Sequence, residues 1–104
     1  MIKVTTLINL LKKNDIDFFT GVPDSVLKEL SSLLQSKNKK KHIIATSEGS
    51  AVSIGIGHYL STKKLPAVYM QNSGLSNALN PLISIAHEKV YSIPLILIIG
   101  WRGS

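Results

Sequence analysis

The chain contains no cysteine among its 104 residues, which excludes disulfide bonds and thiolate metal sites. Acidic residues are also scarce, with six against twelve lysines and arginines. The longest apolar run, Ile93–Ile99, is broken by Pro94 and is far shorter than the roughly 20 residues that span a bilayer. The N-terminus lacks the basic and apolar segments of a secretory signal. We therefore expect a cytoplasmic protein that does not enter a membrane.

The basic excess gives a net charge of +6 and is concentrated in the segment Lys37–Lys41, which holds four lysines. Such a run binds nucleic acid or other anions in some proteins. More often it is a solvent-facing loop between two elements. No aromatic residue is interleaved with these lysines, as base stacking would require. We expect a solvated loop and no nucleic-acid partner.

Helical and strand patterns alternate along the chain, and no internal repeat is visible. The expected strands are Ile16–Val22, His42–Ala45, Ala67–Met70 and Tyr91–Gly100. The expected helices have an apolar stripe over Val4–Leu11, a cap at Asp24 or Ser25, a cap at Thr46 or Ser47, and a span of about Leu75–His87. This alternation predicts an α/β fold with an open parallel sheet flanked by helices.

Two further features concern burial. His42–Ala45 is apolar enough to be a short buried strand, and Tyr91–Gly100 is nearly all apolar. Because a nearly all-apolar strand such as Tyr91–Gly100 needs cover on both faces, we expect the chain to be part of a larger polypeptide, truncated after the fourth strand, or to need a partner.

The three histidines lack metal-ligand spacing and are expected in structural or surface positions. Tyr69 is expected to place its hydroxyl at a rim.

Three polar loops follow expected strands, namely Gly21–Ser25, Thr46–Ser50 and Gln71–Gly74. In a parallel sheet the carboxyl ends of the strands share one edge, so these loops should line one crevice. Glu48 is the lone carboxylate in the second loop and is flanked by small side chains, which makes it a candidate site residue. The alternative is an ordinary acidic residue in a first helical turn, where the helix dipole favours it.

Much of the chain resembles the N-terminal part of phosphonopyruvate decarboxylases, which are thiamine-diphosphate-dependent enzymes. The α subunit of sulfopyruvate decarboxylase is similar too, especially over Met70–Leu75, whereas Asn80–Pro81 and Gly100–Arg102 favour the phosphonopyruvate enzyme. The matching segments occur in the same order and cover nearly the whole chain. They are Phe19–Ser25, Ala45–Ala51, Tyr69–Leu75, Asn80–Leu82 and Val90–Gly103.

The resemblance implies that residues 1–104 form an incomplete pyrimidine-binding domain. It also implies that Glu48 is catalytic: its carboxyl group hydrogen-bonds the aminopyrimidine of thiamine diphosphate and promotes the tautomer that deprotonates the thiazolium ring. The family's diphosphate- and Mg²⁺-binding domain, with its Gly-Asp-Gly sequence, has no counterpart in this chain. We therefore expect no metal ligand here and an inactive chain when it is alone.

The other two loops match active-site loops of the same family. Gln71, Asn72 and Ser73 are implied to contact the cofactor. Asp24 and Ser25 are implied to lie near the substrate. On the residues alone, Asp24 and Ser25 are equally typical of helix capping, and Asn72 is typical of a turn.

The implied activity of the larger protein is that of a lyase of phosphonate metabolism: thiamine-diphosphate-dependent decarboxylation of 3-phosphonopyruvate to phosphonoacetaldehyde and carbon dioxide. One alternative is the α subunit of a sulfopyruvate decarboxylase. A noncatalytic α/β interaction module is the other. The expected partners are a small 2-oxo acid, a diphosphate-binding domain or subunit, and further copies in a homo-oligomer.

Overall fold

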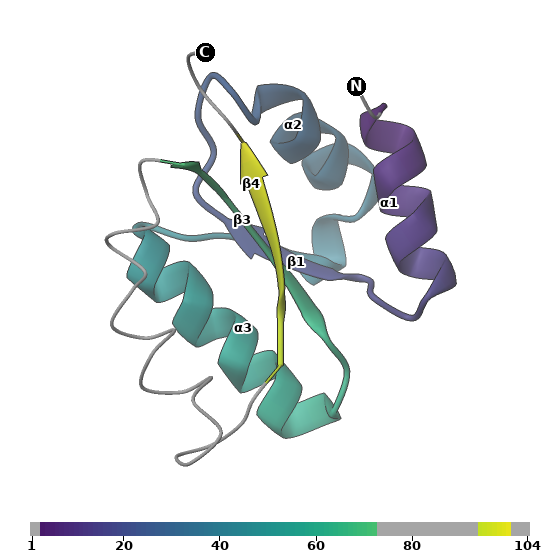
Figure 1. Cartoon of the computed structure of the whole chain (residues 1–104), viewed down its shortest axis with the longest axis vertical. Helices are drawn as coiled ribbons and strands as arrows, with labels where there is room; N and C mark the ends of the chain where they lie inside the picture. The colour runs from purple at the N-terminus through teal and green to yellow at the C-terminus, as the bar shows by residue number, and fades with distance from the viewer. Residues whose placement is uncertain (1–2, 73–93, 101–104) are drawn as a thin grey trace.

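In the described part of the chain, four parallel strands form one sheet with helices on both faces (Figure 1). The computed structural model describes residues 3–72 and 94–100. The strands lie in the order β2-β1-β3-β4, with the bounds β1 Phe18–Gly21, β2 His42–Ile44, β3 Pro66–Gln71 and β4 Ile96–Gly100. The helices are α1 Val4–Lys13, α2 Lys28–Lys37 and α3 Glu48–Thr62, and a 3₁₀ turn, η1 Lys39–Lys41, precedes β2. The predicted α/β fold with an open parallel sheet is confirmed.

Part of the expected structure falls where the chain is not described. The helix expected at about Leu75–His87 and the first residues of the expected fourth strand lie outside the described residues. Within residues 3–72 and 94–100, no helix is long and apolar enough to cross a bilayer.

The two central strands supply both halves of the core, because successive side chains of a strand point to opposite faces. Phe19 and Tyr69 are completely buried on the face covered by α1 and α2, where Leu30 and Leu34 pack on them. Val68 belongs to the other cluster, which α3 completes; its remaining buried members are Ala45, Ala51, Val52, Ile56 and Met70. Both faces of β3 are therefore covered, which agrees with its continuous apolar sequence.

The prediction that His42–Ala45 is a buried strand is wrong for its middle. Ile43 and Ile44 are 44% and 52% exposed, although His42 and Ala45 are buried. The reason is position: β2 is the last strand at one side of the sheet and pairs only with β1. An apolar sequence indicates that a strand can be buried, but only the order of the strands decides which one is left at the edge.

Of two glycines in α3, only Gly55 faces the sheet and allows the helix to lie close to it. A Cβ atom at Gly55 would lie 2.9 Å from Cγ2 of Val68, which is closer than real side chains approach. At Gly57 the same atom would meet nothing within 4 Å. Gly55 is therefore required by packing against β3, whereas Gly57 is not.

A buried polar contact joins three elements on the α1/α2 face. His42 Nε2 lies 2.7 Å from the Tyr69 hydroxyl, and His42 Nδ1 lies 3.0 Å from Oε1 of Gln35 in α2. Burial raises the pKa of Tyr69 to about 12 and lowers the pKa of His42. Because an amide oxygen lies at Nδ1, the neutral ring donates a hydrogen bond there. Its Nε2 accepts a hydrogen bond from the Tyr69 hydroxyl.

This contact corrects one expectation and confirms another. Tyr69 is fully buried, so its hydroxyl does not reach a rim as expected. His42 has the structural role expected of it, and His58 stacks on Phe18 with ring centroids 4.1 Å apart. His87 lies outside the described residues.

We expect the native state to lose stability as the pH falls through about 6.5, because burial lowers the pKa of both His42 and His58. The unfolded chain then binds protons that the folded chain does not, and this favours unfolding. Urea denaturation at several pH values measures the effect. His42→Gln and His58→Gln should each reduce the slope of the unfolding free energy against pH, and the double variant should remove this slope near pH 6.5. An unchanged slope in the double variant would refute the assignment to these two histidines.

Candidate functional site

All four strands end at the same edge of the sheet, as their parallel pairing requires. Gly21, at the end of β1, lies opposite Ile44 of β2 and Tyr69 of β3. Gln71 lies opposite Gly100 at the ends of β3 and β4. The loops that follow β1, β2 and β3 therefore leave the sheet side by side. The prediction of one shared edge is confirmed for the described parts of these loops.

Gly21 allows β1 to lie this close to β3 at the point where the loop after β1 begins. A Cβ at this position would collide with the Tyr69 carbonyl oxygen and ring. Hydrogen bonds then continue beyond the strand ends, from Ala45 N to Gly21 O at 2.9 Å and from Val22 N to Tyr69 O at 3.2 Å. The backbone at this edge is consequently held on both sides of β1.

Glu48 is the first residue of α3 and lies directly after the β2 loop. Ser47 is the N-cap residue, and its Oγ accepts a hydrogen bond from the Ser50 backbone N–H at 3.1 Å. Of the two caps that the sequence allowed, Ser47 is the one used. The cap fixes where the helix starts and thereby places a partly buried carboxylate at the shared edge.

One carboxylate oxygen of Asp24 accepts a hydrogen bond within its own loop, and the other has no partner in the described structure. Its Oδ1 accepts a hydrogen bond from the Leu27 backbone N–H at 2.9 Å. The helix itself begins only at Lys28, and its N-cap, Leu27, has no side-chain cap. Asp24 thus closes the turn before α2 rather than capping the helix. Its Oδ2 is shielded from solvent and has no hydrogen-bond partner within the described structure.

Gln71 has a similar unsatisfied group on the neighbouring strand. It is the last residue of β3 rather than the first of a loop, and its Oε1 is buried without a hydrogen-bond partner among the residues described. Asn72 follows it at the same edge, and Ser25 follows Asp24. Ser73 lies outside the described residues.

The packing beneath the Asp24 loop was not recognised from the sequence. A Cβ at Gly100 would lie 2.8 Å from Cγ of Leu27 and 2.9 Å from Cγ1 of Val26. A helix capped at Asp24 or Ser25 would contain Val26 and Leu27, whereas both precede α2 and pack on the end of β4. The available signal was a glycine at the end of an otherwise bulky apolar strand.

The chemistry of this edge suits a ligand that donates hydrogen bonds. Asp24 Oδ2 and Gln71 Oε1 are buried acceptors, and such groups are normally paired in proteins. Glu48 adds a carboxylate at the same edge. Within residues 3–72 and 94–100 no three His, Asp or Glu side chains are grouped so as to hold a metal ion. These described groups fit a ligand with hydrogen-bond donors better than they fit an anion or a metal ion.

Comparison with known proteins supports this reading of the fold. Residues 3–104 match the family described as "Thiamine pyrophosphate enzyme, N-terminal TPP binding domain". The chain is similar over 96% of its length to the crystal structure of benzoylformate decarboxylase from Polynucleobacter necessarius, of which it covers 18%. The TM-score is 0.76 and the sequence identity 27%.

Two kinds of curated relative are similar in sequence. The α subunit of sulfopyruvate decarboxylase from Methanocaldococcus jannaschii is 42% identical over 95 residues, which are 91% of this chain and 54% of that protein. Phosphonopyruvate decarboxylase from Streptomyces hygroscopicus is 33% identical over 103 residues, which are 99% of this chain and 25% of that protein. The chain thus spans about half the length of the first relative and a quarter of the second.

We expect Gln71→Met to leave the free chain as stable as before or to stabilise it by about 1 kcal/mol, because an unsatisfied buried oxygen is removed. Gln35→Met is the matched control and should destabilise by about 1 kcal/mol, because it leaves His42 Nδ1 without its partner. Urea denaturation measures both variants. Equal destabilisation by the two changes would mean that Gln71 is satisfied in the folded chain.

Proposed function

Since this chain belongs to the thiamine pyrophosphate enzyme family through the family's N-terminal TPP binding domain, we propose that it is the pyrimidine-binding part of a 2-oxo acid decarboxylase. The observation that carries the proposal is the position of Glu48. It starts α3 at the edge where Asp24 and Gln71 hold unpaired buried acceptors. Thiamine diphosphate, when bound, supplies the carbanion and the electron sink that loss of carbon dioxide needs.

Glu48 is the proposed catalytic residue of this chain. Its carboxyl group exchanges a proton with a ring nitrogen of the aminopyrimidine and keeps that ring in the required tautomer. The Ser47 cap contributes by fixing the first turn of α3, so the carboxyl group is oriented before the cofactor arrives. A group positioned in advance in this way need not reorganise during the reaction.

Gln71 and Asp24 are proposed to bind and orient. The unpaired Oε1 of Gln71 would accept a hydrogen bond from the cofactor, and Asn72 and Ser73, the next two residues in the sequence, are proposed to contact it too. The unpaired Oδ2 of Asp24 would accept a hydrogen bond near the substrate, with Ser25 beside it. Asp24 can do this without loosening its loop, because Oδ1 alone holds the Leu27 N–H.

The remaining parts of the cofactor site are proposed to come from another domain or subunit. The described edge offers acceptors, whereas a diphosphate and Mg²⁺ need donors and a group of carboxylate or carbonyl ligands. The relative with 42% identity is named as an α subunit, which supports a two-chain arrangement. We also propose that the complete protein assembles as an oligomer.

The substrate is proposed to be a small 2-oxo acid that carries a phosphonate or sulfonate group. The sequence motifs favour 3-phosphonopyruvate. The higher identity, 42% against 33%, favours sulfopyruvate as the second candidate. Both acids share the keto-acid carbons at which decarboxylation occurs and differ in the charge and size of the distal group.

In the complete protein, Glu48→Gln should lower the rate of carbon dioxide release by roughly tenfold to a few hundredfold. A hydrogen bond with a charged partner is worth about 1.5–3 kcal/mol, which corresponds to that range. Glu29→Gln is the matched control, because Glu29 also lies in a first helical turn but is exposed on α2. Circular dichroism checks that both variants fold.

The same pair of variants tests the rival role of a noncatalytic interaction module. If Glu48→Gln and Glu29→Gln release carbon dioxide equally fast, Glu48 has no catalytic role. If the wild-type complete protein releases none from either acid in the presence of thiamine diphosphate and Mg²⁺, the proposed activity itself is wrong.

Competition between the two acids, with pyruvate as the reference, identifies the substrate. We expect the preferred acid to exceed pyruvate in kcat/KM by about ten- to a hundredfold, because a charged contact to the distal group is lost with pyruvate. A preference for 3-phosphonopyruvate supports the first assignment, and a preference for sulfopyruvate supports the second. Equal use of pyruvate would contradict both.

A further inference from the structure

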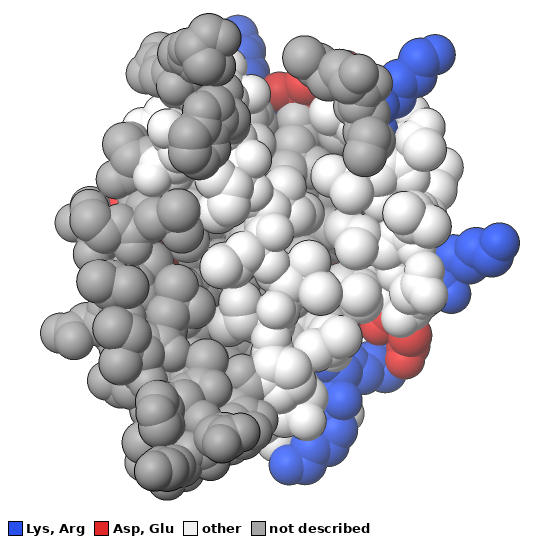
Figure 2. All heavy atoms as spheres, in the orientation of Figure 1, with Lys and Arg blue, Asp and Glu red and all other residues white. Residues whose placement is uncertain are grey.

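The charges of the chain are divided between the two ends of the sheet. Eight of the ten lysines in the described residues lie in the last turn of a helix or between a helix and the strand that follows it, which is the end opposite Glu48. They are Lys12, Lys13, Lys37, Lys39, Lys40, Lys41, Lys63 and Lys64. Figure 2 shows lysine side chains projecting from the rim of the molecule into solvent.

Only two acidic residues of the described chain lie at this lysine-rich end, and both already have partners. Asp17 contacts Lys41 at 2.7 Å, and Asp15 contacts Lys64 at 3.3 Å. The hydrogen bond from Lys41 holds the pKa of Asp17 below its usual value. The other six lysines have no ion-pair partner within residues 3–72 and 94–100. This end therefore carries uncompensated positive charge.

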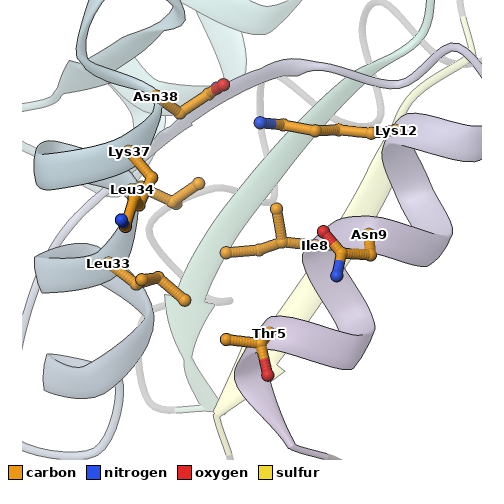
Figure 3. A pocket seen from close by; sticks show the side chains of 8 residues that line it. All are labelled: Thr5, Ile8, Asn9, Lys12, Leu33, Leu34, Lys37 and Asn38. Carbon is orange, nitrogen blue, oxygen red and sulfur yellow. The ribbon is translucent and has the colours of Figure 1, made fainter.

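A groove between α1 and α2 opens toward this end. Its volume is about 230 Å³, below the roughly 300–1,000 Å³ of sites for drug-sized ligands. Ile8 of α1 and Leu33 and Leu34 of α2 form an apolar floor, and the Lys12 side chain extends across it toward Asn38 (Figure 3). Lys37 and Asn38, at the end of α2, also line the groove.

The cationic end of this groove is shared with a second hollow. Lys37 and Asn38 line both the groove and a hollow formed by the lysine segment that ends at Lys41. A lysine in the last turn of a helix offsets the negative end of the helix dipole. Lys12 lies in the last turn of α1 and Lys37 in the last turn of α2, and both residues line the apolar groove.

We propose that the groove between α1 and α2 binds a small amphiphilic anion, with its apolar body on Ile8, Leu33 and Leu34 and its charged group between Lys12 and Lys37. The shape sets the size of the ligand, the floor selects an apolar chain, and the lysines select a carboxylate or a similar anion. The site is separate from the edge that carries Glu48, so it represents a second ligand site of the chain.

Octanoate is a suitable probe, because it combines an apolar chain with one carboxylate. In titrations of the ¹⁵N-labelled chain followed by NMR, octanoate should shift amide signals of α1 and α2 around the groove. Lys12→Gln combined with Lys37→Gln should weaken binding by about fivefold or more, the size expected for two exposed charge pairs. The matched control is Lys3→Gln combined with Lys28→Gln, at the opposite ends of the same helices, and should leave binding unchanged.

Two further ligands separate the contributions of charge and chain. Acetate has the charge without the apolar chain, and octylamine has the chain with the opposite charge. Both should bind much more weakly than octanoate. The proposal is overturned if octylamine shifts the same signals equally, if the variant lacking Lys12 and Lys37 binds octanoate like the wild type, or if octanoate shifts signals away from α1 and α2.

Discussion

The close approach of β1 and β3 at Gly21 is the constraint on which the described structure depends. No side chain fits there, because a Cβ would collide with the Tyr69 backbone. The approach keeps the two central strands in register up to their carboxyl ends and lets hydrogen bonds continue into the loops on both sides. It also fixes Tyr69, whose buried hydroxyl holds His42 on the edge strand. One glycine thus links the register of the sheet to the position of the loops.

The candidate site differs from the core in how its polar groups are satisfied. In the core, the buried polar atoms of His42 and Tyr69 bond to each other, and Gln35 bonds the second nitrogen of the histidine. At the carboxyl edge, Asp24 and Gln71 each keep a buried oxygen without a partner in the described structure. Leaving such groups unpaired costs stability, and two of the three such atoms in the described residues lie at this edge, the third being His58 Nε2 on α3, so the edge is favoured as a ligand site.

The two ends of the sheet have opposite chemical character. The carboxyl end combines acceptors with the carboxylate of Glu48, and the amino end gathers the lysines that follow α1, α2 and α3. The alternation of helix and strand creates this separation, because every helix that leads into one of these parallel strands ends at the amino end of the sheet. Lysines placed at the ends of helices therefore accumulate at one end of the molecule, away from the proposed cofactor.

The sequence by itself determined the alternation of elements, the parallel sheet and the grouping of Gly21, Glu48 and Gln71 at one edge, because these follow from local periodicity and chain direction. It did not determine that Ile43 and Ile44 are exposed or that Tyr69 is buried, since exposure depends on strand order. Nor did it reveal that Asp24 uses only one oxygen in its turn. Such facts depend on neighbours distant in sequence, which only the folded chain brings together.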